Sequence, residues 1–259
     1  MAAAPTPLRV FITGASSGIG AALARGYARR GAVLGLVSRR EAALRELAQS
    51  LGTVTRPYVA DVRMAEALAD AAAAFTGEFG APDVVIANAG VSYGTLTERA
   101  DDYEAFREIL ATNVNGMAAT FAPFIPALQE RGDGTLVGVA SVAGYRGLPG
   151  SEAYSASKAA AIVYLESLRI RLRAHGIAVI TISPGYIDTP MTRGNPYPMP
   201  FLLDADRAAA AMIRAIDRRA RYTIVPWPMA IVARLLRLIP NAVWDRLMAR
   251  APHKPRKPQ

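Results

Sequence analysis

Residues 8–30 read LRVFITGASSGIGAALARGYARR, and this stretch decides the fold. Leu8–Ile12 is a short apolar run of the kind that forms a buried strand. A turn follows whose glycines are spaced G-x-x-x-G-x-G, and an amphipathic helical pattern then covers 19–29. Backbone without Cβ at a helix N-terminus lets free N–H groups approach a phosphate closely. The phosphate-binding residues predicted from this turn are Gly14, Ser16, Ser17, Gly18, Ile19 and Gly20.

The same alternation of strand and helix continues along the chain. Apolar strands are predicted at 32–37, 53–59, 84–86, 134–139 and 177–182, and helices at 41–49, 65–75 and 154–174. The stretch 103–129 is also predicted to be helical, with interruptions at Pro123 and Pro126. Near-continuous apolar strands alternating with helices are typical of a parallel sheet covered on both faces. We therefore predict one doubly wound α/β domain of the Rossmann type over residues 1–225, with its ligands beyond the carboxyl ends of the strands.

Composition limits the functions that this domain can have. With 259 residues, 52% of them hydrophobic, the chain can form a large core, and without cysteine it has neither disulfides nor thiolate metal ligands. Only two histidines are present, so no metal site is predicted. The net charge of +9 is scattered and no groove-reading motif occurs, so no nucleic-acid partner is expected. Residues 1–7 lack the pattern of a signal peptide, and we expect a cytoplasmic protein.

Residues 226–250 form a C-terminal extension that reads as two amphipathic helical segments. Their apolar residues are interspersed with Arg234, Arg237, Arg246 and Arg250, and no run is long enough to span a bilayer. Two roles stay open for this extension. It could make peripheral contact with an anionic membrane, or it could pack over the pocket or against a second subunit. Residues 251–259 are predicted to be a disordered basic tail.

The second predicted strand ends at Val37 and continues Ser38-Arg39-Arg40, without an acidic residue. An NAD-binding chain normally has an acid there to hold the adenosine ribose. Ser38 can donate to a phosphate oxygen, and the forked donors of arginine suit a 2′-phosphate. The pattern favours NADP(H) over NAD(H), although Arg39 and Arg40 could also be ordinary surface charges.

Lysine is rare in this chain. Of 30 basic residues only three are lysine, namely Lys158, Lys254 and Lys257. Lys158 follows Tyr154 by four residues, which places both on one face of a helix. A lysine kept in an arginine-rich background indicates chemistry that needs a compact ammonium group. The alternative is chance, since a surface helix is a common place for a lysine.

Taken together, seven ordered motifs resemble the short-chain dehydrogenases/reductases over about 9–189. They are Thr13-Gly14-x-x-x-Gly18-Ile19-Gly20, Asp61-Val62, Asn88-Ala89-Gly90, Asn113, Ser141, Tyr154-x-x-x-Lys158 and Pro184-Gly185 leading to Thr189. The resemblance implies an NADP(H)-dependent oxidoreductase that interconverts a carbonyl and a secondary alcohol. The alternative from the residues is a nucleotide-binding regulator or scaffold whose catalytic residues are unused.

The resemblance also assigns roles to the catalytic residues. Tyr154 would be the general acid or base, and Lys158 would lower the pKa of its hydroxyl and reach the nicotinamide ribose. Ser141 would orient the substrate oxygen. Asn113 would bend its helix locally and hold a water that connects Lys158 to solvent. Where the family usually has a pair of serines, Ala140 precedes Ser141, so a single hydroxyl is available.

The remaining cofactor contacts are implied in the same way. They would come from Asp61 and Val62 at the adenine, from Asn88, Ala89 and Gly90 along the sheet, from Tyr154 and Lys158 at the ribose, and from Pro184, Gly185, Ile187 and Thr189 around the nicotinamide.

Substrate choice is predicted to depend on a lid at about 190–205, which is rich in proline and apolar residues. This composition indicates a fairly hydrophobic carbonyl compound or alcohol, although any mobile loop could have the same composition. The predicted substrate contacts are Ser141, Tyr145, Leu148, Tyr186, Met191 and Phe201. Since the family is usually oligomeric, a homodimer or homotetramer is expected.

Overall fold

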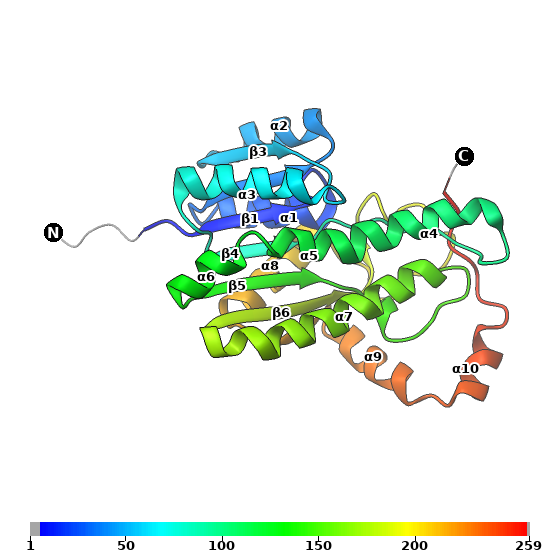
Figure 1. The fold of residues 1–259 in the computed structure, drawn as a ribbon. Helices are drawn as coiled ribbons and strands as arrows, with labels where there is room; N and C mark the ends of the chain where they lie inside the picture. The colour runs from blue at the N-terminus through cyan, green and yellow to red at the C-terminus, as the bar shows by residue number, and fades with distance from the viewer. Residues whose placement is uncertain (1–5, 258–259) are drawn as a thin grey trace.

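A seven-stranded parallel sheet forms the centre of the molecule in a computed structural model that describes residues 6–257 (Figure 1). Its strands, in spatial order, are β3 (Thr55–Val59), β2 (Val33–Ser38), β1 (Arg9–Thr13), β4 (Val84–Ala87), β5 (Gly134–Val139), β6 (Ile177–Pro184) and β9 (Tyr222–Val225). In the register of the sheet, Val10 of β1 lies beside Leu34 of β2 on one side and Val84 of β4 on the other. The predicted doubly wound α/β fold is confirmed.

Helices cover both faces of this sheet (Figure 1). One face carries α1 (Gly18–Ala28), α2 (Glu41–Ser50) and α8 (Ala205–Asp217), and the other carries α3 (Ala65–Phe79), α5 (Gly116–Phe121), α6 (Ile125–Arg131) and α7 (Glu152–Leu172). Successive strand residues point to opposite faces. Val10 and Ile12 of β1 therefore pack into the first core, and Phe11 between them packs into the second. Burial on both faces explains why the strands read as unbroken apolar runs.

The structure corrects the predicted helix at 103–129. That region divides into α4 (Tyr103–Leu110), a π-helical turn η2 (Ala111–Asn115), α5 and α6. Pro126 lies in the first turn of α6, where a missing N–H is tolerated. Short elements were not predicted, because two to four residues carry little periodicity. They are strands β7 (Ile187–Asp188), β8 (Leu203–Asp204) and β9, and 3₁₀ turns η1 (Ala100–Asp102), η3 (Val142–Gly144) and η4 (Arg173–His175).

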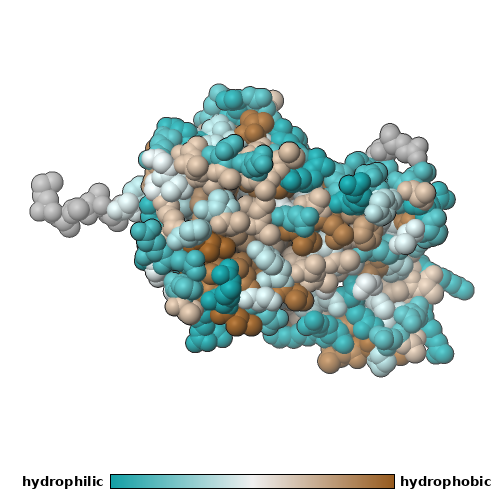
Figure 2. Space-filling view, viewed as in Figure 1, coloured by the Kyte–Doolittle hydropathy of each residue, from teal (hydrophilic) through white to brown (hydrophobic). Residues whose placement is uncertain are grey.

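The C-terminal extension forms two helices, α9 (Pro228–Leu238) and α10 (Asn241–Met248). Met229 and Ala233 of α9 are buried against Val142, beside the loop that carries Ser141. The outer face of the two helices is apolar and exposed, and it comprises Trp227, Ile231, Leu235, Leu238, Val243 and Leu247. Figure 2 shows apolar surface over this region at the lower edge of the molecule. Within residues 6–257, no helix combines the length and the apolar composition needed to cross a membrane.

The predicted disordered tail is wrong for the residues that the structure describes. After α10 the chain runs along one end of the molecule to α4 (Figure 1), and Gly94 and Arg256 form a parallel β-bridge. The guanidinium of Arg256 pairs with the buried carboxylate of Asp102, at 2.6 Å. The ammonium of Lys257 pairs with Glu108, also at 2.6 Å. The basic residues that made this tail look disordered are thus paired with acidic residues far away in the sequence. Residues 258 and 259 lie outside the described part.

Candidate active site

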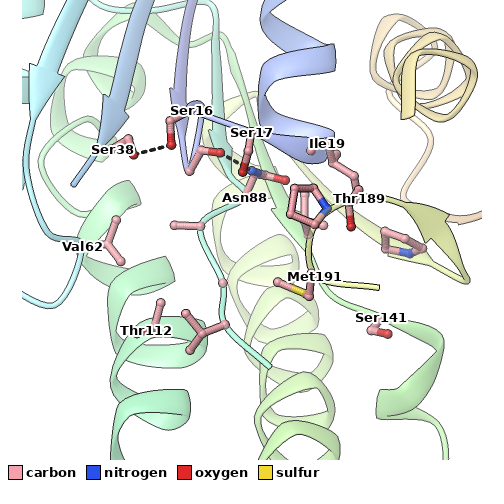
Figure 3. Close-up of a pocket in the computed structure, with 18 of the residues that line it drawn as sticks. Ser16, Ser17, Ile19, Ser38, Val62, Asn88, Thr112, Ser141, Thr189 and Met191 are labelled. Atoms are coloured by element: carbon pink, nitrogen blue, oxygen red, sulfur yellow. Dashed lines mark hydrogen bonds between the residues drawn. The ribbon is translucent and has the colours of Figure 1, made fainter. Parts of the chain in front are cut away.

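A cleft of about 400 Å³ opens at the carboxyl ends of the strands, where the strand order reverses between β1 and β4. This reversal is where doubly wound sheets bind their ligands, since the chain crosses to opposite faces on either side of it. Figure 3 shows side chains from several loops pointing into the cleft. The structure brings together every residue predicted to bind the cofactor along its wall except Gly20.

The glycine-rich turn forms one end of this cleft. Gly14 and Gly18 have φ values of +69° and +53°, which glycine adopts without strain. A Cβ on Gly14 would lie 2.7 Å from the Cα of Ala89. A Cβ on Gly20 would lie 2.2 Å from the carbonyl oxygen of Gly14, so Gly20 supports the turn from beneath. No side chain caps α1 at Ser17 in the described structure, and the first N–H groups of the helix fit an anion.

Polar side chains line the cleft where the adenosine ribose would lie. The hydroxyl groups of Ser16 and Ser38 are 2.6 Å apart, as Figure 3 shows. Arg40 donates from Nη2 to the hydroxyl of Ser16 at 2.8 Å and also to that of Ser17. These groups form a cationic, donor-rich corner that fits a phosphate monoester.

Arg39 points to the other side of this corner. Its Nη1 lies 3.5 Å from a carboxylate oxygen of Asp61 and 3.8 Å from one of Glu108. Asp61 is also held by Arg63, at 2.6 Å. Burial acts to raise the pKa of Asp61, but the hydrogen bonds from Arg63 and the charge of Arg39 hold it below its usual value. Asp61 is therefore ionised and neutralised by its neighbours.

The predicted catalytic residues meet at the opposite end of the cleft. Tyr154 and Lys158 lie one turn apart near the start of α7, and both line the cleft with Ser141. The ammonium of Lys158 is buried, donates to the carbonyl of Val139 at 2.9 Å, and lies 5.7 Å from the centroid of the Tyr154 ring. The loop is packed tightly on the helix, because a Cβ on Gly144 would lie 2.7 Å from the backbone of Lys158.

Burial acts on the proton equilibria of both Tyr154 and Lys158. It raises the pKa of Tyr154, and a hydrogen bond with Ser141 acts in the opposite direction. Burial also lowers the pKa of Lys158 to about 8. The phenol therefore keeps its proton at neutral pH, while the lysine loses its proton more readily than an exposed lysine does.

Asn113 lies in the π-helical turn and is almost fully buried. Its amide accepts a hydrogen bond from the N–H of Val91 at 2.9 Å and donates to the carbonyl of Val91 at 3.0 Å. The same amide donates to the hydroxyl of Ser157 on α7, also at 3.0 Å. The local distortion expected at Asn113 is present, and the amide ties the loop after β4 to α7.

The predicted substrate residues occupy different places. Ser141 and Met191 line the cleft, whereas Tyr145 and Leu148 line a second, shallow hollow between the loop 144–149 and α7. The hydroxyl of Tyr145 forms a hydrogen bond with that of Tyr222, on the edge strand β9. Phe201 has 52% of its surface exposed and lines neither cavity.

Tyr186 faces a residue that the sequence reasoning missed. Its ring centroid lies 6.3 Å from that of Tyr197, in the proline-rich segment of the predicted lid. Burial is the main reason why the pKa of Tyr197 rises to about 12, and the nearby phenol groups of Tyr186 and Tyr154 add to it. Tyr197 thus packs beside Tyr186, in the segment that follows Thr189. An aromatic residue within the predicted lid was the signal that could have identified Tyr197 from the sequence.

Lys254 is the second missed residue. Its ammonium lies 5.7 Å from the centroid of the Tyr154 ring, the same distance as that of Lys158. The scarcity of lysine pointed to Lys158, and the same signal applied to Lys254, but its place in an apparently disordered tail concealed it.

Comparisons with known proteins agree with this geometry. The family model described as short chain dehydrogenase matches residues 9–197. An uncharacterised oxidoreductase of Myxococcus xanthus is 42% identical over 238 residues, which cover 91% of this chain and 94% of the relative.

Solved structures give the same result. A 3-ketoacyl-(acyl-carrier-protein) reductase of Brucella melitensis in complex with NADH has a TM-score of 0.78 and 26% identity, over 84% of this chain and 96% of the other. The L-sorbose reductase of Gluconobacter frateurii, in complex with NADPH and L-sorbose, has a TM-score of 0.77 and 25% identity, over 85% and 95% of the two chains. This chain is an oxidoreductase and belongs to the short-chain dehydrogenase family.

Proposed function

We propose that this protein interconverts a carbonyl compound and a secondary alcohol with NADP(H), and that its substrate is a fairly hydrophobic small molecule. The observation that carries the proposal is the convergence of Ser141, Tyr154 and Lys158 at one end of a cleft whose other end is a glycine-rich, phosphate-fitting turn. The cofactor, when bound, supplies or accepts the hydride.

The residues of the chain handle the proton and orient the substrate. Ser141 holds the carbonyl oxygen beside Tyr154, whose hydroxyl donates its proton as charge develops on that oxygen. Since burial keeps the proton on the phenol, the group is ready to act as an acid. The ammonium of Lys158 then stabilises the phenolate through its charge at 5.7 Å from the ring.

NADP(H) is the proposed cofactor because β2 ends in a serine and two arginines, with no acid to bind the ribose of NAD(H). Ser38 and Arg40 lie next to the phosphate-binding turn, and Arg39 flanks them. Related structures contain either NADH or NADPH, so cofactor preference has to come from residues of this chain.

We also propose that the protein forms a homodimer or homotetramer through α4 and α7. Val163 and Ile170 on α7 are 63% and 67% exposed, and Ala156 and Ala160 extend the same side of the helix. An exposed apolar stripe on a central helix is typical of a surface that meets another subunit.

The catalytic proposal is tested with Tyr154→Phe. The purified protein is titrated with NADPH and NADH, and oxidation of NADPH is then followed with ketones and aldehydes graded from small and polar to long-chain. We expect Tyr154→Phe to bind NADPH normally and to lose about 10²–10⁴-fold in turnover, the usual contribution of a general acid. Tyr164→Phe, on the same helix outside the cleft, is the control. Equal turnover by wild type and Tyr154→Phe would contradict the assignment.

A further inference from the structure

Residues 252–257, here called the C-terminal strap, are fixed against the substrate end of the cleft. The N–H of Gly94 donates to the carbonyl of Pro255 at 2.8 Å, and two ion pairs to Asp102 and Glu108 hold the end of the strap. Arg256 and Lys257 supply these pairs, so both cations already have acidic partners.

The loops beneath the strap contact its backbone and side chains closely. A Cβ on Gly94 would lie 2.1 Å from the carbonyl oxygen of Lys254, and one on Gly150 would lie 2.6 Å from the imidazole of His253. Contacts this close require glycine at both positions. The strap is therefore seated in a groove formed by the loops that follow β4 and β5.

Lys254 differs from its two cationic neighbours in the strap. Its ammonium donates to the hydroxyl of Ser92 at 2.8 Å, and no carboxylate of residues 6–257 lies within ion-pair distance of it. Burial lowers the pKa of Lys254 to about 8. A partly buried ammonium without a counter-charge is unfavourable, and an anion bound beside it would remove that cost.

The position of this ammonium connects it to the reaction. Ser92, its partner, follows Val91, which lines the cleft and is held by Asn113. Lys254 and Lys158 lie equally far from the ring of Tyr154, but the ammonium of Lys158 donates a hydrogen bond to the carbonyl of Val139 in β5. Lys254 comes from the strap, outside the residues that line the cofactor cleft.

We propose that Lys254 determines substrate specificity by binding an anionic group, a carboxylate or a phosphate, that the substrate carries near its reacting carbonyl. This inference rests on the proposed function and adds a substrate class to it. The rest of the substrate can still be apolar, since Met191 lines the same cleft.

The binding test uses the full-length protein saturated with NADP⁺ and does not depend on turnover. Hexanoate, hexyl phosphate and the neutral hexanamide are titrated by calorimetry into wild type, Lys254→Met and Lys257→Met. We expect at least one of the two anions to bind wild type at least about tenfold more tightly than the amide, and Lys254→Met to remove that difference. The stronger anion identifies carboxylate or phosphate as the preferred group.

Lys257→Met is the matched control, because it removes a lysine of the same strap that is already paired with Glu108. It should leave all three affinities within about twofold of wild type. Two results would overturn the proposal: anion affinities that are equal in wild type and Lys254→Met, or no preference of wild type for either anion over the amide.

The turnover test compares 2-, 3-, 4- and 5-oxohexanoate with their methyl esters, with NADPH as reductant. We expect Lys254→Met to lower the acid-to-ester ratio of kcat/KM at least about tenfold, mainly through the KM of the acid. The acid that is reduced best gives the separation of anion and carbonyl. An equal loss on acid and ester would assign Lys254 to the acidity of Tyr154 and would overturn the substrate role.

Failure of the two proposals can be told apart. If neither the acids, the esters nor the other ketones are reduced, the proposed function fails, and the calorimetric comparison still decides the role of Lys254. Gly94→Val is the second variant, because its side chain would collide with the backbone of the strap and leave the cleft residues unchanged. It should lose the same anion preference as Lys254→Met, and retention of that preference would count against the strap.

Discussion

Tyr154 is the residue around which the proposed chemistry is arranged. One lysine reaches it along its own helix, a second comes from the strap, and Ser141 contacts its hydroxyl. Two ammonium groups near one ring favour the phenolate, while burial disfavours it. The balance between burial and these two charges sets how readily the phenol gives up its proton. Each lysine can be replaced separately to measure its share.

The pKa of Lys158 predicts the pH dependence of reduction. Burial lowers this pKa to about 8, so the ammonium is present at neutral pH and is lost as the pH rises through 8. We expect kcat/KM for a neutral ketone to fall above about pH 8, because the phenolate then loses its stabilising charge. The measurement uses Lys254→Met with a neutral ketone, because Lys254 also faces Tyr154 and burial lowers its pKa to about 8 as well. A rate that stays level between about pH 7 and 9.5 would contradict this role.

The two arginines after β2 predict cofactor preference. Replacing Arg39 and Arg40 together by alanine should weaken NADPH at least about 100-fold, since charge-assisted hydrogen bonds to the 2′-phosphate contribute about 1.5–3 kcal/mol each. Affinity for NADH should change less than about threefold. Fluorescence titration of both cofactors measures the effect, and Arg45→Ala, in α2 outside the cleft, is the control. Equal weakening of NADPH and NADH would refute the assignment.

At the level of secondary structure, the helical region between β4 and β5 shows how an element positions the site. The π-helical turn η2 interrupts the run from α4 to α5, and π-turns inside helices frequently mark functional sites. Here the turn directs the amide of Asn113 at the partly buried N–H and carbonyl groups of Val91. The loop that carries Ser92 is held in place by this contact.

This arrangement predicts a stability effect. Asn113→Ala should lower the free energy of unfolding by about 1–3 kcal/mol, because it removes the hydrogen bonds of a buried amide to Val91 and to Ser157. Asn115→Ala is the matched control, since Asn115 lies in the same turn and is exposed. Urea unfolding monitored by circular dichroism gives both values. A loss at Asn115 as large as that at Asn113 would show that the helix, and not the amide contact, is responsible.

For the molecule as a whole, the exposed stripe on α7 predicts assembly. Light scattering of wild type should give a dimer or tetramer, and Val163→Glu combined with Ile170→Glu should give a monomer, because charges are costly in a desolvated interface. Val54→Glu is the control, since Val54 is also exposed but lies outside the helices. Wild type that is monomeric at all concentrations would reject the oligomer.

The amino-acid sequence alone determined the parallel sheet, the glycine-rich turn and the pairing of Tyr154 with Lys158. Each depends on a local pattern: apolar strands buried on both faces, backbone without Cβ at a helix start, and a spacing of four residues on one helix. These patterns predicted nearly the whole wall of the cofactor cleft, since each strand end carries its own short motif.

Only the tertiary structure decided what surrounds Tyr154 on the substrate side. Lys254 reaches it from a segment with no regular periodicity, and a basic tail reads as disordered until its acidic partners are known. Asp102 and Glu108 provide those partners from a region far away in the chain. Contacts of this kind depend on long-range charge pairing and on close approach of backbone at Gly94, and neither leaves a pattern along the sequence.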